Sequence, residues 1–319
     1  MSYTGPGFEP PQPRRSRRGP LTVALAALVP GALLGWAVYA AVGGSGGDEG
    51  SGSTAASASA PPSASASASA SSGTPSPAPS AGSEDEKPSA PAAASGPLKG
   101  KVVVIDPGHN PENFKHTAEI NRQVDIGTNR KECDTTGTST NDGYAEADFT
   151  LDVAHRMRTL LEKQGATVKL TQDGDRPFGP CVDERARIGN KAEADAVVSI
   201  HADGSGTGNR GFHVILPGAV DAGAADTRAI VEPSDDLGTR IAGNFVRVTG
   251  SAPSNYVGGG TGLVTRKDLG GLNLSTVPKV FIECGNMRDS KDAALLTSGA
   301  WRQKAAQGIS DGIVSFLRG

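Results

Sequence analysis

Residues 43–97 contain no Val, Ile, Leu, Met, Phe, Tyr or Trp, and this gap decides how much of the chain can fold. The segment consists mainly of Ala, Ser, Pro and Gly, so it lacks the apolar surface that offsets the entropy lost on ordering. We therefore predict a disordered linker over 43–98. The remaining stretch, 99–319, is long enough to bury one large core, and we expect a single folded domain there.

The amino-terminal residues predict export from the cytoplasm. A basic cluster at 14–18 precedes 21–42, a run without a charged residue. As a helix this run would be about 33 Å long, enough to cross a bilayer core of about 30 Å. Because basic residues stay inside the cell, we expect 1–20 to be a cytoplasmic tail and the rest of the chain to lie outside the cytoplasm.

Two alternatives remain open for 21–42: an uncleaved membrane anchor, or a signal segment whose cleavage releases the protein. We favour the anchor, because a cleavable signal has an apolar region of about 7 to 15 residues and a small-residue cleavage site, which is not found near the end of this run. The pair Arg17-Arg18 leaves a twin-arginine export route open as well.

The charge balance argues against a nucleic-acid partner. The chain has 31 basic and 34 acidic residues, a formal net charge of -3 at pH 7. A phosphate-binding surface requires Lys and Arg clustered on the folded part, so we expect no nucleic acid to bind. The composition leaves the oligomeric state open.

Between residues 101 and 319, apolar runs typical of strands alternate with helical patterns. Short continuous apolar runs that end at turn residues predict strands buried on both faces. Strands that alternate with helices predict an α/β fold with a mostly parallel central sheet and helices on both faces. The predicted strands are 102–105, 167–171, 196–200, 211–216 and 279–283, and the predicted helices are 147–164, 182–194 and 235–249, followed by terminal helices.

Polar side chains stand at the ends of three predicted strands. His109 follows 102–105 through Asp-Pro-Gly, His201 directly follows 196–200, and Glu283 closes the last strand. In parallel sheets, ligands bind in the crevice beyond the carboxyl ends of the strands. We therefore expect these three side chains to face one crevice.

A fourth polar residue, Glu146, is in phase with the buried face of the helix predicted after it. An unpaired carboxylate at such a position is costly, and a metal ion would remove that cost. Two imidazoles and one carboxylate are the ligand set of a catalytic zinc with its fourth position open to water. The pattern thus favours a Zn²⁺ site made of His109, Glu146 and His201, with Glu283 as an additional acid.

Ordinary structural roles remain alternatives for each of these residues. A histidine after a strand is commonly a hydrogen-bonded structural residue, and an acid in the first turn of a helix is favoured by the helix dipole. The residue Asp106 is either an orienting partner of a ligand imidazole or part of an ordinary turn. The competing histidines, which we rank lower as ligands, are His116, His155 and His213.

From Lys101 to its carboxyl terminus, the chain resembles the zinc-dependent N-acetylmuramoyl-L-alanine amidases of the amidase type 3 family, in particular the single-domain amidases of actinobacteria. The motifs that carry the resemblance are, in order, Ile105-Asp-Pro-Gly-His109, Tyr144-Ala-Glu146, Arg187-Ile-Gly-Asn190, Val198-Ser-Ile-His-Ala-Asp203 and Phe281-Ile-Glu-Cys-Gly-Asn286. The last motif departs from the family pattern, because Asn286 follows Gly285 directly.

The resemblance implies a single zinc-hydrolase domain that cleaves the amide between N-acetylmuramic acid and L-alanine in peptidoglycan during cell-wall remodelling. One Zn²⁺ would be held by His109, Glu146 and His201, and Glu283 would be the general acid/base. Two functions of other kinds stay open: a wall-binding module that holds peptidoglycan without cleaving it, and a zinc carboxypeptidase or deacetylase that acts on the same polymer.

Two further residues are candidate substrate contacts. Arg266 lies in 261–273, a segment that could form one wall of a groove before the last strand. Its guanidinium would pair with a stem-peptide carboxylate, or it is a solvated surface charge. Asn286 would orient substrate, or it caps the following helix.

The chain contains three cysteines, Cys133, Cys181 and Cys284. The first two lie in predicted loops, whereas Cys284 lies at a strand end and is expected to be packed. Outside the cytoplasm a disulfide can persist. We therefore predict a disulfide between Cys133 and Cys181.

Overall fold

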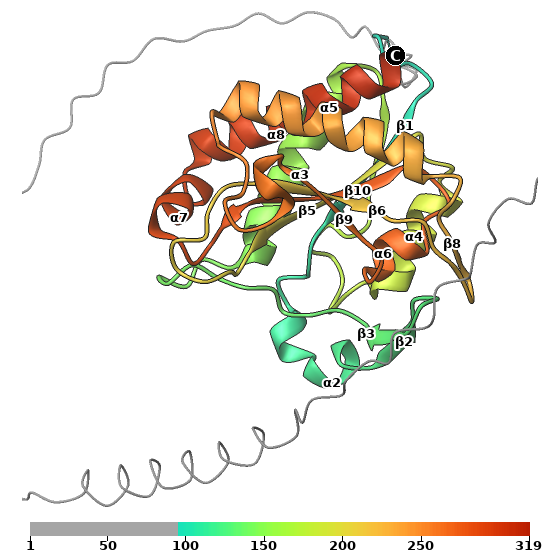
Figure 1. Cartoon of the computed structure of the whole chain (residues 1–319), viewed down its shortest axis with the longest axis horizontal. Helices are drawn as coiled ribbons and strands as arrows, with labels where there is room; N and C mark the ends of the chain where they lie inside the picture. Colours follow the sequence, from blue (N-terminus) through green and yellow to red (C-terminus); the bar gives the residue numbers. More distant parts are fainter. Residues whose placement is uncertain (1–94) are drawn as a thin grey trace, which may run out of the picture. The chain divides into compact units, whose positions relative to one another are not determined.

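The computed structural model describes residues 95–319 (Figure 1). The predicted tail 1–20, the apolar segment 21–42 and the linker up to residue 94 lie outside the described residues. No helix within 95–319 combines the length and the apolar character needed to cross a membrane. Leu98, the last residue of the predicted linker, is fully buried, and its N–H donates to the carbonyl of Gln164 at 2.9 Å. The packed domain therefore begins slightly before residue 99.

A six-stranded sheet forms the centre of the domain, in the order β4-β1-β5-β10-β6-β9. Every neighbouring pair of strands is parallel except β10 and β6, which are antiparallel. The mostly parallel sheet is thus confirmed. The strands are β1 (Val102–Pro107), β4 (Thr167–Leu170), β5 (Ala196–Asp203), β6 (His213–Pro217), β9 (Leu263–Arg266) and β10 (Lys279–Asn286).

Helices cover both faces of this sheet, as expected. Three long helices, α3 (Glu146–Lys163), α5 (Val231–Thr249) and α8 (Gly299–Arg318), pack on one face, and α4 (Val182–Lys191) and α6 (Gly270–Asn273) lie on the other (Figure 1). Helix α5 begins four residues before its predicted start and includes Pro233 in its first turn. The sequence pattern did not indicate this earlier start. A proline is compatible with the first turn of a helix, because the N–H groups there have no hydrogen-bond partner within the helix.

The two faces of the sheet differ in chemistry, because successive side chains of a strand point to opposite faces. Toward the three long helices, the strands β1, β5 and β10 contribute these apolar residues to the main core: Val103, Ile105, Ala196, Val198, Ile200, Ala202, Val280, Ile282 and Cys284. Toward α4 there is a small apolar cluster. The same face also carries polar residues: Asp106, Ser199, His201, Lys279 and Glu283.

The remaining elements lie in the connections between these strands and helices, and α7 is the first of the terminal helices that the sequence predicted after the last strand. They include two small hairpins, β2 (Gln123–Asp125) with β3 (Arg130–Glu132) and β7 (Asp221–Ala222) with β8 (Ala225–Asp226), and the short helices η1 (Asn113–Lys115), α2 (Thr117–Ile120), η2 (Gly258–Gly260) and α7 (Ser290–Leu296). The predicted disulfide between Cys133 and Cys181 is present, and it joins the segment after β3 to the start of α4. Cys284 is a free, buried thiol.

Candidate metal centre

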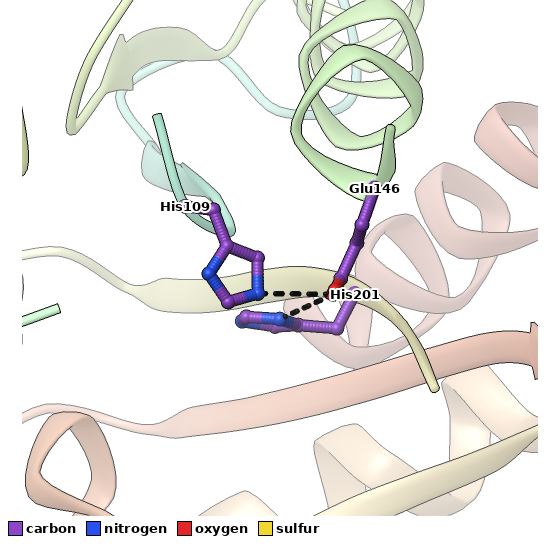
Figure 2. Close-up of side chains that lie close together, drawn as sticks. All are labelled: His109, Glu146 and His201. Atoms are coloured by element: carbon purple, nitrogen blue, oxygen red, sulfur yellow. Dashed lines mark hydrogen bonds and ion pairs between the residues drawn. The ribbon is translucent and has the colours of Figure 1, made fainter. Parts of the chain in front are cut away.

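His109, Glu146 and His201 come together in the structure (Figure 2). They belong to the loop after β1, the first residue of α3 and the carboxyl-terminal part of β5. One carboxylate oxygen, Glu146 Oε1, lies 3.1 Å from His109 Nε2 and 3.0 Å from His201 Nδ1. The structure thus brings together the three residues that the sequence predicted as metal ligands.

The imidazole of His109 has one nitrogen directed at Glu146 and the other at a carbonyl. Its Nδ1 lies 3.0 Å from the carbonyl oxygen of Thr135. A carbonyl only accepts hydrogen bonds, so Nδ1 carries a hydrogen and donates it. The nitrogen left to bind a metal ion is then Nε2, which faces the carboxylate of Glu146. A second-sphere bond of this kind fixes the tautomer of a ligand histidine.

The loop that carries His109 passes very close to His201. His109 has a φ of 65°, which is strained for a residue other than glycine. At the preceding position, Gly108, a Cβ would lie only 2.3 Å from Cε1 of His201. A glycine is therefore needed at 108 for the two histidines to approach each other.

Glu146 is buried and held at both oxygens. Its Oε2 accepts from the backbone N–H of Thr138 at 2.9 Å, and its Oε1 accepts from that of Ala202 at 3.1 Å. Burial by itself raises the pKa of Glu146, but His109 and His201 together outweigh burial and lower the pKa. Glu146 is therefore a carboxylate.

The same carboxylate favours positive charge on its neighbour. Burial alone lowers the pKa of His109, yet Glu146 raises it to about 9. Two imidazole nitrogens and an anionic oxygen thus converge at a point that stabilises a cation. Nitrogen and oxygen donors of these kinds are ligands of Zn²⁺, so the three residues fit a metal ion.

Glu283 lies beside this group. It is paired in register with His201 on the neighbouring strand, and a cavity of about 270 Å³ is lined by Glu283 together with the three candidate ligands. Its Oε2 is buried and has no hydrogen-bond partner within residues 95–319. Burial, followed by the charges of Glu146 and Asp203, raises the pKa of Glu283 well above its usual range. Glu283 is thus a carboxyl group that can carry a proton next to the candidate metal centre.

The two candidate substrate contacts differ in their surroundings. Arg266 lines the same cavity, and its guanidinium is held by Asp268 at 2.6 Å. Asn286 is fully buried, and its Nδ2 faces three carbonyl oxygens of the loop over 205–209. The alternative that Asn286 caps the next helix is wrong, because the side chain of Asp289 caps α7.

The competing histidines do not join the candidate ligands. His116 pairs with Glu119, and His155 pairs with Asp173. His213 is buried in β6, directly opposite Glu283 on β10.

Asp106 does not contact His109, the imidazole nearest to it in sequence. It reaches His201 instead, through the hydroxyl of Ser199. Two other charged residues around Asp106, Arg185 and Lys279, are buried and were not among the predicted site residues. The sequence did contain features that could have indicated their burial. Arg185 is in phase with the buried residues of α4, and Lys279 is the first residue of a buried strand.

Comparison with known proteins agrees with the geometry of this site. The family described as N-acetylmuramoyl-L-alanine amidase matches residues 103–315. The N-acetylmuramoyl-L-alanine amidase Rv3717 of Mycobacterium tuberculosis is 40% identical over 230 residues, which cover 72% of this chain and 91% of that protein.

Two solved amidase structures share the fold. The crystal structure of Ami1 from Mycobacterium smegmatis is 40% identical, with a TM-score of 0.63 over 70% of this chain and 99% of that one. The apo form of Ami1 from Mycobacterium abscessus has the same identity and TM-score over 69% of this chain and 100% of that one. The chain described here therefore belongs to the N-acetylmuramoyl-L-alanine amidase family.

Proposed function

We propose that this protein is a zinc-dependent enzyme that hydrolyses the amide between N-acetylmuramic acid and the first L-alanine of the peptidoglycan stem peptide. The observation that carries the proposal is the convergence of His109 Nε2 and His201 Nδ1 on Glu146 Oε1, beside the unpartnered carboxyl oxygen of Glu283. Membership of the amidase family supports the bond that is cleaved.

In this proposal His109, Glu146 and His201 hold one Zn²⁺. When bound there, the ion would supply a Lewis acid that polarises the scissile carbonyl and lowers the pKa of water. The backbone N–H groups of Thr138 and Ala202 hold the carboxylate of Glu146 in place. The carbonyl of Thr135 orients the ring of His109.

Glu283 acts as the general acid/base. Its carboxylate takes a proton from the attacking water and returns it to the amine of the departing L-alanine. This shuttle requires a carboxyl group whose proton affinity is higher than usual, and the burial of Glu283 near Glu146 and Asp203 raises its pKa in that direction.

Arg266 is the proposed contact for a carboxylate of the stem peptide. Its side chain is partly exposed at the cavity, and Asp268 holds the guanidinium from one side. Asp268 occupies the fork made by Nε and Nη2, so Nη1 and the second N–H of Nη2 would remain to pair with an anion. Asn286 supports the loop over 205–209 in this scheme, so any contact with substrate would be made by the loop.

We place the domain outside the cytoplasm, tethered by 21–42 as an anchor or released after cleavage of that segment. The disulfide between Cys133 and Cys181 supports an oxidising location, because such bonds rarely persist in the cytoplasm. Peptidoglycan is then the partner within reach.

Mass spectrometry of the soluble products tests this function. Purified peptidoglycan is digested by the full chain with and without a zinc chelator, and the variant Glu283→Gln serves as a folded control. We expect stem peptides with a free L-alanine amino group, formed only without chelator and only by the wild type. Cleavage at another bond would indicate a carboxypeptidase or deacetylase, and intact polymer with folded, zinc-loaded protein would indicate a wall-binding module.

A further inference from the structure

Four charged side chains are buried together beneath the two histidines. Asp106 and Lys279 are fully buried, and Arg185 and Asp134 are 4% and 6% exposed. Two acids and two bases leave this buried charge cluster with no net charge. Burying such groups is costly unless every one is paired, and an apolar replacement is often at least as stable. The cluster therefore needs an explanation other than stability.

Arg185 is the centre of the buried charge cluster, and all five of its N–H groups have an acceptor. Two go to carboxylates: Nη1 donates to Asp106 at 2.8 Å and Nη2 to Asp134 at 2.9 Å. The other three go to backbone carbonyls, those of Pro107 at 2.7 Å, His109 at 2.9 Å and Pro180 at 2.9 Å. A guanidinium with this geometry has no freedom left.

These contacts hold the strained loop that carries His109. A φ of 65° for a histidine is unfavourable and persists only where surrounding contacts enforce it. Arg185 binds the carbonyls of Pro107 and His109, which flank the strained position. Through Asp134 it also fixes the segment whose next residue, Thr135, accepts from the ring of His109.

Asp106 connects the same cluster to His201. The hydroxyl of Ser199 donates to Asp106 Oδ2 at 2.9 Å and lies 3.2 Å from His201 Nε2. A carboxylate only accepts, so the single hydroxyl hydrogen of Ser199 must go to Asp106. The oxygen of Ser199 then accepts from His201, which places a hydrogen on Nε2 and leaves Nδ1, the nitrogen that faces Glu146, as the one that can bind an ion.

We propose that Arg185 and Asp106 are positioning residues for the metal centre. Arg185 acts through the backbone on either side of His109, and Asp106 acts through the hydroxyl of Ser199. Together they fix a hydrogen on Nδ1 of His109 and on Nε2 of His201, so that the nitrogens left to hold an ion are Nε2 of His109 and Nδ1 of His201, which face Glu146. This inference rests on the metal site of the proposed function and explains how that site is built before an ion binds.

Two hydroxyl side chains that donate to Asp106 provide a matched test. Ser199 lies between Asp106 and His201, whereas the side chain of Thr171 donates to the other oxygen of Asp106 at 2.6 Å and forms no hydrogen bond with His109 or His201. The variants Ser199→Ala and Thr171→Val each remove one donor from the same carboxylate. Circular dichroism verifies that both full-length variants are folded.

The first measurement is the dissociation constant for Zn²⁺, obtained by competition with a chelating dye. Losing a second-sphere partner typically weakens metal affinity about 10–100-fold. We expect that loss for Ser199→Ala, and a change of less than about threefold for Thr171→Val. Equal losses in both variants, or none in Ser199→Ala, would overturn the proposal.

The second measurement is the tautomer of His201 in the metal-free protein, read from nitrogen-15 chemical shifts. The wild type and Thr171→Val are expected to hold hydrogen on Nε2, and Ser199→Ala to give a mixture of tautomers. A wild type without hydrogen on Nε2 would refute the positioning role. If the wild type binds no zinc, the proposed function fails, but this measurement still decides the positioning role.

Arg185→Lys tests the other branch of the cluster. Lysine keeps the charge but cannot reach five acceptors, so we expect a loss of zinc affinity larger than that of Ser199→Ala. Wild-type zinc affinity in folded Arg185→Lys would overturn the role of Arg185. If this variant does not fold, the pair at Ser199 and Thr171 still decides the role of Asp106.

Discussion

The face of the central sheet under α3, α5 and α8 is packed with aliphatic side chains, whereas the face toward α4 and α6 carries the candidate metal centre and the buried charge cluster. Strands β1, β5 and β10 contribute to both faces, because alternate residues of each strand point to opposite sides of the sheet. Hydrophobic contacts need only the right volume. Buried charges instead need particular partners at particular distances, so we expect stability to depend mainly on the first face and chemistry on the second.

Replacing Glu283 should produce the largest effect on turnover. Glu283 and its neighbour Ile282 lie on opposite faces of strand β10, so variants at these two positions compare the two faces of the sheet. Loss of a general acid/base typically lowers turnover about 10²–10⁴-fold, and we expect this for Glu283→Gln with one zinc ion per chain retained. The measurements are product release from peptidoglycan and metal content.

The adjacent residue Ile282 is the matched control, because it points into the apolar core. Ile282→Val should reduce the free energy of unfolding by about 0.5–1.5 kcal/mol and leave turnover near that of the wild type. Wild-type turnover in Glu283→Gln would show that another group moves the proton.

A cavity in the apolar face should affect stability alone. Leu237 of α5 is fully buried in the main core. Truncating such a leucine to alanine costs about 2–5 kcal/mol, and we expect Leu237→Ala to lose that much in urea denaturation. The zinc dissociation constant should not change. A parallel loss of zinc affinity would mean that the two faces are not independent.

The disulfide should affect both stability and metal binding, because it belongs to the polar side of the sheet. It joins Cys133, two residues before Thr135, to Cys181 at the start of α4. Replacing both cysteines with serine should cost about 2–4 kcal/mol of stability and also weaken zinc binding. Added reductant should destabilise the wild type but have no further effect on the double variant, and unchanged wild-type stability would contradict this.

Acid should weaken the polar face through Asp106. Burial by itself raises the pKa of Asp106, but Lys279 and Arg185 outweigh burial and hold the pKa well below its usual value of 3.8. A carboxyl group whose pKa is lowered by folding stabilises the folded state fully at pH values above its usual pKa. This contribution is lost as the pH falls from the usual pKa toward the lowered one. The free energy of unfolding should therefore decline below about pH 4.

The variant Asp106→Asn isolates this contribution. One proton linked to unfolding changes the free energy of unfolding by about 1.4 kcal/mol per pH unit. Between pH 4 and 2.5, the free energy of unfolding of the variant should therefore fall less steeply than that of the wild type, with a slope smaller by up to about 1.4 kcal/mol per pH unit. Leu237→Ala, whose change lies on the apolar face, should keep the wild-type slope. Equal slopes for Asp106→Asn and the wild type would assign the acid sensitivity to other carboxyl groups.

Much of the candidate site could be predicted from local pattern. His109 and Glu283 stand at the ends of apolar runs, and parallel strands bring such ends to one edge of the sheet. Glu146 was found from helix phase, because a carboxylate on a buried helix face needs a partner. These inferences use only the few residues on either side of each position.

The sequence by itself determined the alternation of strands and helices, the one folded domain and the residues that face its crevice, because periodicity and turn residues are local properties. Only the tertiary structure decided the partners. Arg185 binds carbonyls of Pro107, His109 and Pro180, and strand β9 exists because it pairs with β6 far along the chain. Hydrogen bonds between distant segments depend on where the backbone places each donor and acceptor, and no local pattern encodes that placement.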